Sequence, residues 1–130
     1  MRNESYASEK KGKTGIKRII NAFGYSKDGL AAAYRYESAF RQVLWLNLIL
    51  IVLTFILNFD SATKMLLIIA SFVSLITELF NTAVEAAVDH TSTEKHELAK
   101  RAKDAGSAAQ LLALTMLGIV WAIALWREYV

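Results

Sequence analysis

The chain has 130 residues, of which 55% are hydrophobic and 21% are charged, and its formal net charge is +3. This length allows one domain, and the apolar content exceeds the roughly 45 to 50% of soluble domains, which favours a membrane protein. Cysteine is absent, which excludes disulfide frameworks, thiolate zinc sites and thiol nucleophiles, and the absence of proline suits long uninterrupted helices.

The polar first part of the chain predicts a flexible arm followed by a surface helix. We expect residues 1–12 to be flexible and residues 14–42 to form the surface region. Apolar residues there recur at i, i+3, i+4 and i+7, as Ile16, Ile19, Ile20 and Phe23. This spacing is typical of an amphipathic helix that lies on a membrane. An interruption is expected at Gly24-Tyr25-Ser26, where Ser26 is a suitable N-cap for a second helical stretch.

Three apolar segments are each long enough to cross a membrane, which takes roughly 17 to 25 residues of helix. They cover residues 43–59, 65–88 and 108–126. The connection NFDSATK is so short that it predicts a hairpin turn, whereas the charged segment 89–107 predicts a longer loop. The sequence therefore predicts one all-α membrane domain over residues 1–130, with a surface helix and three transmembrane helices.

The distribution of basic residues predicts the orientation of these helices. Of the 15 Lys and Arg residues, nine precede Val43 and four lie in the second loop, which leaves only Lys64 and Arg127 for the other side. The positive-inside rule then puts the amino terminus and the second loop in the cytoplasm. The basic residues between positions 10 and 18 suit anionic lipid headgroups, so we expect a membrane partner and no nucleic acid.

A stripe of polar residues runs through the second apolar segment. Its members are spaced 3, 4, 3, 4 and 4 residues apart and are Ser71, Ser74, Glu78, Asn81, Glu85 and Asp89. This spacing puts them on one face of a helix. A charge near the bilayer centre costs about 2.5 to 3.5 kcal/mol on insertion scales, so two glutamates in one span require a physical explanation.

Three explanations of the stripe remain open on spacing alone. The carboxylates could specify helix assembly, or Glu78 could load and unload a proton or cation in a small transporter. The third explanation is a metal-dependent reaction at the cytoplasmic interface, in which Glu85 lies toward the cytoplasm, where a metal and a nucleotide could bind. Glu78 lies two turns deeper, about 10 Å at 1.5 Å per residue, beside the headgroup of a lipid.

The residues around the stripe resemble a known family. The motifs are ITELFNTAVEAAVD (76–89), EKHELAKRAKDAGSAA (94–109) and RIINAFGYSKDGLAAAYRYESAFRQ (18–42). Together they resemble the prokaryotic integral-membrane diacylglycerol kinase family over almost the whole chain. The resemblance implies ATP- and Mg²⁺-dependent phosphorylation of diacylglycerol to phosphatidate by a homotrimer in the bacterial inner membrane. A related branch phosphorylates undecaprenol, and HELAKRAKDAGSAA is more similar to the diacylglycerol branch.

The resemblance also implies roles for individual residues. Glu78 corresponds to the general base, with Asn81 beside it, and Glu37 and Glu85 correspond to the metal-binding carboxylates. The positions around the nucleotide are Arg18, Tyr25, Glu37, Glu85, Glu94, Lys95, His96, Lys103 and Asp104. The positions near the lipid substrate are Arg18, Ala39, Phe40, Arg41, Gln42, Ser107 and Trp121. The chain departs from the family pattern at Asn21 and Val43.

Local patterns around the second loop have simpler interpretations. Glu97 with Arg101 and Lys100 with Asp104 are spaced as i, i+4 ion pairs of a helix surface. The small residues Ala102, Gly106, Ala109 and Ala113 favour close helix packing. Asp89 has two interpretations, as catalytic support or as the cytoplasmic end of the second span.

Overall fold

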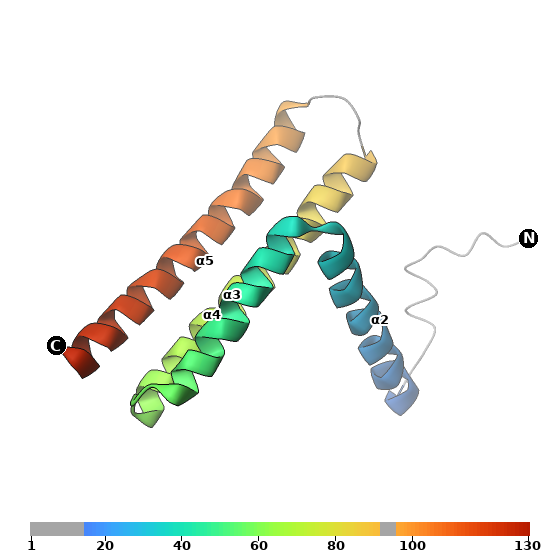
Figure 1. Cartoon of the computed structure of the whole chain (residues 1–130). Coiled ribbons are helices and arrows are strands. Elements are labelled where there is room, and N and C mark those ends of the chain that lie inside the picture. The colour runs from blue at the N-terminus through green and yellow to red at the C-terminus, as the bar shows by residue number, and fades with distance from the viewer. Residues whose placement is uncertain (1–14, 92–95) are drawn as a thin grey trace, which may run out of the picture. The chain divides into compact units, whose positions relative to one another are not determined.

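The described residues, 15–91 and 96–130 of a computed structural model, form four α-helices (Figure 1). These are α2 (Gly15–Tyr36), α3 (Ser38–Ile56), α4 (Ser61–Thr91) and α5 (Glu97–Tyr129). The chain divides into two compact units, one that ends at Tyr36 and one that begins at Glu37. Helices α3, α4 and α5 are long and apolar enough to cross a membrane, so the prediction of three spans is confirmed.

The first unit contains α2, a continuous amphipathic helix of 22 residues. Ile16 and Phe23 of its apolar stripe are both more than 70% exposed, as expected of a helix that lies on a membrane. The interruption expected at Gly24-Tyr25-Ser26 is wrong, because the helix continues through these residues. A single glycine costs a helix only about 1 kcal/mol, which the rest of the helix offsets.

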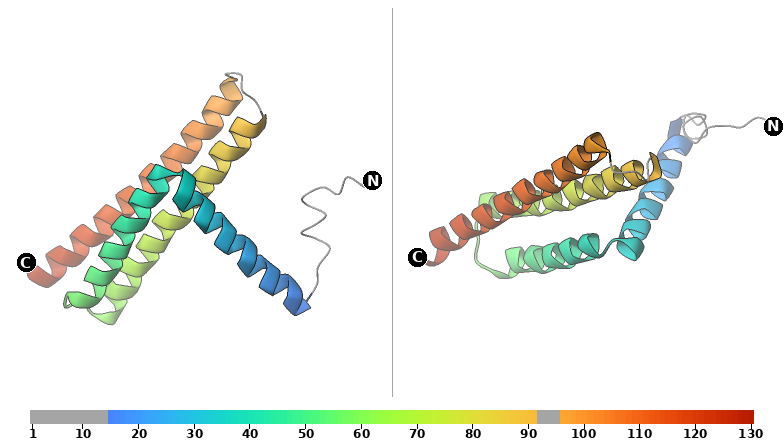
Figure 2. Two further views of the ribbon diagram at one scale, coloured as in Figure 1. Left: turned by 45° about the vertical axis from the view of Figure 1, so that its right-hand side comes forward. Right: turned by 90° about the horizontal axis from the view of Figure 1, so that it is seen from above.

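The second unit contains the three long helices. Helix α4 packs against both α3 and α5, and it is antiparallel to each of them (Figures 1 and 2). This arrangement gives the unit two ends, which we call the turn end, where α3 connects to α4, and the loop end, where α4 connects to α5. Many side chains on the outer faces are large, apolar and exposed, as a lipid-facing surface requires.

The turn end is held by polar contacts around Asp60. The expected hairpin turn is confirmed, since α3 ends at Ile56 and α4 begins at Ser61. Asp60 caps α4, because its carboxylate accepts a hydrogen bond of 2.8 Å from the Thr63 N–H, and hydrogen bonding from Thr63 lowers the pKa of Asp60. Arg127 of α5 forms an ion pair of 3.2 Å with the same carboxylate, which brings the end of α5 to the turn.

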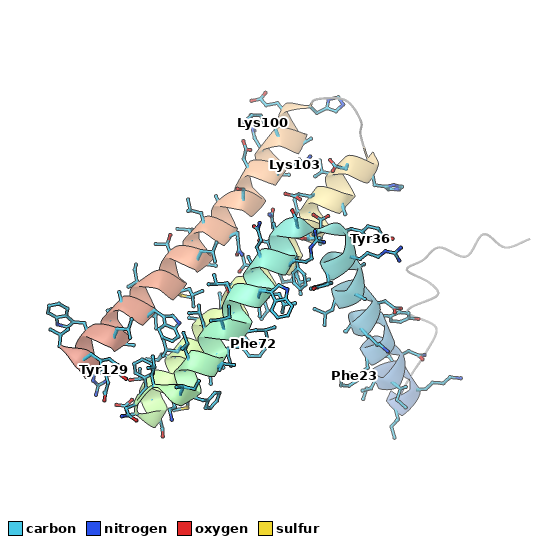
Figure 3. The ribbon with its side chains drawn as sticks, in the orientation of Figure 1. Phe23, Tyr36, Phe72, Lys100, Lys103 and Tyr129 are labelled. Carbon is cyan, nitrogen blue, oxygen red and sulfur yellow. The ribbon has the colours of Figure 1, made fainter. Side chains whose placement is uncertain are left out.

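An apolar core lies beside this turn and contains Phe59, Leu67, Ala70, Leu117, Trp121 and Ala124. Phe59 contacts the Trp121 ring edge-to-face, with 5.8 Å between the ring centroids, and it contacts Tyr129 in the same way. Tyr129 lies at this end of α5 (Figure 3), where its hydroxyl accepts a hydrogen bond of 3.3 Å from the Asn58 N–H. Aromatic contacts of this geometry add about 0.5 to 1.5 kcal/mol to the burial of the rings.

The long charged loop expected over residues 89–107 is wrong. Helix α4 continues to Thr91 and α5 begins at Glu97, so most of the segment is helical. An apolar run in the sequence marks only the part of a helix that can lie within a membrane. The charged residues next to each run continue the same helix beyond the membrane. The expected pairs support this extension, since Arg101 bonds Glu97 at 2.8 Å and Lys100 bonds Asp104 at 2.6 Å.

Candidate active site

The polar stripe of α4 is confirmed as one face of the helix, and its burial decreases along the chain. Ser71 and Ser74 are completely enclosed, and Glu78 is only 5% exposed. Asn81 and Glu85 are half-buried, and Asp89 is exposed. The stripe therefore runs from the interior of the three-helix unit to its surface at the loop end, and Glu78 is its deepest carboxylate.

Glu78 lies within reach of charged and polar groups from all three helices of the unit. The carboxylates of Glu85, two helical turns further along the same face of α4, and of Glu37, just before α3, are near enough to act on it electrostatically. The side-chain amide of Gln110 on α5 also interacts with it. Poor solvation and neighbouring carboxylates both make a carboxylate more ready to accept a proton, so this environment is typical of a general base.

Glu37 lies where the helix predicted over residues 14–42 is divided. Its backbone is extended, with φ −116° and ψ 106°, and its carbonyl oxygen accepts the first hydrogen bond of α3, from Arg41 N–H at 3.2 Å. Its carboxylate makes no capping hydrogen bond to α3. Glu37 is half-buried and close enough to Glu78 to act on it electrostatically. On a continuous surface helix, Glu37 would instead be expected to be a solvated charge.

Glu37 and Glu85, together with phosphate oxygens, would make a ligand set of the kind that magnesium takes. Carboxylate oxygens are hard ligands, and Mg²⁺ in phosphoryl-transfer sites commonly takes one or two of them together with phosphate and water. Glu37 and Glu85 supply two such groups. Within residues 15–91 and 96–130, no three His, Cys, Asp or Glu side chains come close enough to hold a metal ion by themselves. A nucleotide would therefore have to bring the remaining ligands.

Gly106 of α5 packs directly against Asn81. A Cβ atom at position 106 would clash with the side-chain Oδ1 of Asn81, whereas the Asn81 Cα lies at an ordinary contact distance of 3.8 Å. The Asn81 Oδ1 is buried, and none of the described residues donates a hydrogen bond to it. The absence of a side chain at Gly106 therefore leaves the space that the amide of Asn81 occupies, which confirms the close packing expected at this position.

Lys103 connects α5 to the outer end of the stripe. Its Nζ donates a hydrogen bond of 2.7 Å to the carboxylate of Asp89, and Glu85 also attracts it electrostatically. Figure 3 shows Lys100 and Lys103 at the loop end of α5, opposite Tyr129. Asp89 is thus paired with Lys103, which the resemblance assigns to the nucleotide site. Sequence patterns alone could not identify this pair. Asp104 is exposed and pairs with Lys100.

A pocket of about 500 Å³ lies between the ends of α4 and α5. Its lining residues are Val88, Thr91, His96, Glu97, Leu98, Ala99 and Ala102. His96 is exposed, and its carbonyl oxygen accepts the hydrogen bond from Lys100 N–H at 3.0 Å that begins α5. Glu94 and Lys95, the other two residues of the expected nucleotide turn, lie outside the described residues. The pocket adjoins the charged groups of the loop end.

The expected lipid-site residues do not gather in one place. Ala39, Phe40, Arg41 and Gln42 lie in the first turn of α3, and Ser107 is exposed on α5. Trp121 is buried in the apolar core at the turn end. Ser107 and Trp121 are 14 positions apart on α5, which corresponds to about 21 Å of helix, so one subunit does not bring these two side chains together. Arg18 and Tyr25 lie on α2, in the first unit.

Two residues that sequence reasoning did not select belong to this interior. Asn47 of α3 and Gln110 of α5 are both buried, and each donates a hydrogen bond to Ser74 of the stripe. Each of them is a long polar side chain within a predicted apolar span, which is a rare type of residue there and a signal of function. The sequence shows that these two polar residues are present in apolar spans. It does not show that both of them bond Ser74, which only the packing of the three helices brings about.

The chain is similar to known bacterial membrane enzymes. Residues 24–125 match the family described as prokaryotic diacylglycerol kinase. The diacylglycerol kinase of Pseudomonas aeruginosa is 51% identical over 112 residues, which cover 86% of this chain and 91% of the relative. The diacylglycerol kinase of Escherichia coli strain K12 is 46% identical, over 89% of this chain and 95% of the relative. The diacylglycerol kinase of Helicobacter pylori strain 26695 is 50% identical, over 82% of this chain and 84% of the relative.

Proposed function

The chain belongs to the prokaryotic diacylglycerol kinase family, and we propose that it transfers the γ-phosphoryl group of ATP to diacylglycerol with Glu78 as the general base. It is a multi-pass membrane protein of a bacterial inner-membrane kinase family. The observation that carries the assignment of Glu78 is its position, as the deepest carboxylate of a polar stripe that leads to the surface. Kinase activity itself rests on the family and the three relatives.

The orientation and assembly belong to the proposal. The excess of Lys and Arg before Val43 and after Asp89 supports a cytoplasmic loop end, where ATP is available. Trp121 lies far from the other expected lipid-site residues within one subunit. A site that is shared between subunits of a homotrimer, as the resemblance implies, would remove this difficulty. The exposed apolar faces of the three spans leave room for such contacts as well as for lipid.

In this mechanism Glu78 removes the proton from the free hydroxyl of diacylglycerol. The hydroxyl oxygen then forms a bond to the γ-phosphorus of ATP, the bond from that phosphorus to the bridging oxygen breaks, and its electron pair leaves with ADP. Burial of Glu78 keeps water from competing for the phosphoryl group, because water has little access to a side chain that is 5% exposed. Asn81, one turn along the same face, would orient the lipid hydroxyl toward the carboxylate.

Glu37 and Glu85 would hold Mg²⁺ between the carboxylates and the phosphates of the nucleotide. When bound, the ion neutralises charge on the β- and γ-phosphates. Lys103 is close to Glu85 and would bind a phosphate group in exchange for Asp89. An exposed ion pair is worth only about 0 to 1 kcal/mol, so this exchange costs little. The pocket at the loop end, with His96 in its wall, is a suitable place for the rest of the nucleotide.

A kinase assay tests this function. The purified protein in detergent, given ATP, Mg²⁺ and diacylglycerol, should form phosphatidate, and a chelator of Mg²⁺ should stop the reaction. Undecaprenol is the alternative acceptor, and a higher kcat/KM for undecaprenol than for diacylglycerol would reassign the substrate. Failure to turn over either lipid would contradict the proposal.

A separate assay addresses the transport alternative for Glu78. Proteoliposomes with a pH-sensitive dye inside should show no proton flux that depends on Glu78. A flux that is present in the unsubstituted protein and lost in Glu78→Gln would favour a transporter, especially if the lipid assays are negative.

A further inference from the structure

Each of the three long helices contributes one polar side chain to the interior beside Glu78. These are Asn47 of α3, Ser74 of α4 and Gln110 of α5, which we call the interior amide cluster. Asn47 and Ser74 have no exposed surface, and Gln110 is 6% exposed. The cluster lies in segments that are otherwise apolar, one helical turn from Glu78 along α4.

Hydrogen bonds join the members of the cluster across both helix interfaces. Asn47 Nδ2 donates to Ser74 Oγ at 2.7 Å and to the Val43 carbonyl at 2.9 Å, and Ser74 Oγ donates to the Ser71 carbonyl at 2.8 Å. Gln110 Nε2 donates to the Ser74 carbonyl at 3.1 Å. Ser74 therefore receives one bond from α3 and one from α5, which fixes both helices relative to the segment of α4 that carries Glu78.

Gln110 extends the cluster to the carboxylate. Its amide nitrogen carries two hydrogens, and one of them is used on the Ser74 carbonyl. Ser74 precedes Glu78 by one helical turn on the same face of α4, so this hydrogen bond places the buried amide of Gln110 beside the turn that carries the buried Glu78 carboxylate. A second amide hydrogen directed at that carboxylate would restrict the directions in which the carboxylate can point.

Helix packing alone does not account for this choice of residues. Buried polar groups stabilise a protein poorly unless every donor and acceptor is paired. Within the part of the chain that the structure describes, the Oε1 of Gln110 and the Oδ1 of Asn47 are buried and have no hydrogen-bond partner. Apolar side chains of similar size would fill the same space without that cost, so the cluster is better explained by what it does to Glu78.

We propose that Gln110 is a positioning residue for phosphoryl transfer, which holds the Glu78 carboxylate in place while the Ser74 carbonyl holds Gln110. The proposal rests on the role of Glu78 proposed above. Positioning of this kind acts on the chemical step, because a general base must be within hydrogen-bond reach of the proton that it removes. It does not act on the binding of nucleotide at the loop end.

The test compares two substitutions of Gln110. Gln110→Met keeps most of the shape of the side chain and removes the amide, whereas Gln110→Ala removes both. If the amide positions Glu78, both variants should lose about 10- to 100-fold in kcat, as is typical when a group that orients a functional residue is removed, with KM for ATP within about 2-fold. Full kcat in Gln110→Met with loss only in Gln110→Ala would show a packing role and overturn the proposal.

Thr54→Val is the matched control. Thr54 is also a buried polar residue of an apolar span, but its hydroxyl donates its hydrogen bond to the Leu50 carbonyl of its own helix, at 2.8 Å. This variant should keep kcat within about 2-fold, because it removes a buried hydroxyl away from Glu78. If it loses as much kcat as Gln110→Met, any polar loss in the core disturbs the enzyme and the positioning role is wrong.

Glu78→Gln separates this inference from the proposed function. If Glu78→Gln is inactive and Gln110→Met has normal kcat, Gln110 does not position the base, although Glu78 keeps its role. If Glu78→Gln itself turns over normally, the base assignment fails and the positioning role fails with it. If both variants lose kcat, Glu78→Gln with Gln110→Met should be no slower than Glu78→Gln alone, because nothing is left to position. A further additive loss would contradict the proposal.

Discussion

The two ends of the three-helix unit use the same pair of helices, α4 and α5, for different purposes. At the turn end Leu67 of α4 and Trp121 of α5 are buried together with Phe59 of the turn. At the loop end they meet through carboxylates, amides and Lys103, several of which are half-buried. The residues that stabilise the fold thus lie at one end of this helix pair, and the residues that take part in the reaction lie at the other. Substitutions at the turn end should therefore change the unfolding temperature, and substitutions at the loop end should change kcat or KM.

The largest expected effect is at Glu78. Glu78→Gln keeps the size of the side chain and removes its basicity, and general bases contribute about 10²- to 10⁴-fold to rate. We expect kcat to fall by at least 10²-fold while the thermal transition in detergent stays within a few degrees. The measurement is phosphatidate formation alongside thermal unfolding. A variant that unfolds instead of losing kcat would contradict the separation of the two ends.

The opposite result is expected at the turn end. Phe59 is 6% exposed and contacts the rings of Trp121 and Tyr129, so Phe59→Ala should cost about 3 to 5 kcal/mol of stability by leaving a cavity. Activity per folded molecule, measured below the unfolding temperature, should stay within about 2-fold. Phe55→Ala is the control, because Phe55 is exposed in the last turn of α3, just before the turn that carries Phe59, and its loss should change stability little. Equal costs in the two variants would show that Phe59 is not a core residue.

Gly106 offers a test with a smaller effect. The methyl group in Gly106→Ala would meet the Oδ1 of Asn81, so the Asn81 side chain must turn away while the helices stay in place. We expect kcat to fall by about 10-fold, with little loss of stability. Gly118→Ala is the control on the same helix, since a Cβ there meets no atom within 4 Å and alanine favours helix by about 1 kcal/mol. If both variants keep full kcat, Asn81 has no part in the reaction.

The smallest effect is expected at Asp89. Asp89→Asn removes an exposed ion pair with Lys103, which is worth about 0 to 1 kcal/mol. Lys103 then becomes more available to a phosphate, so KM for ATP should stay the same or fall by up to about 3-fold. Lys103→Met should instead raise KM for ATP. A rise in KM in Asp89→Asn of the same size would assign Asp89 itself to the nucleotide site.

Sequence patterns predicted the features that depend on local spacing. The three spans, the hairpin turn at Asp60 and the polar face of α4 follow from apolar runs and periodicity, and the structure confirms them. The i, i+4 pairs of α5 are confirmed for the same reason. These features require no knowledge of which helix lies beside which.

The helix break was misplaced, and the pairings that were missed depend on contacts between distant residues. The helix break at Glu37 occurs in the sequence Tyr36-Glu37-Ser38, where neither glycine nor proline marks it, while Gly24 marks a break that does not occur. The pairing of Asp89 with Lys103 spans 14 residues, and that of Gln110 with Ser74 spans 36. Only the packing of α4 against α5 brings these partners together.

The central claim is that the carboxylates near Glu78 divide the work, with Glu78 at the lipid hydroxyl and Glu85 at the metal. Equilibrium binding of Mg²⁺ and ATP to Glu78→Gln and Glu85→Gln, measured by calorimetry in detergent, tests it most directly. We expect Glu78→Gln to bind both Mg²⁺ and ATP with nearly unchanged affinity although it does not turn over, and Glu85→Gln to bind both more weakly. Equal Mg²⁺ affinities in the two variants would contradict the division of labour.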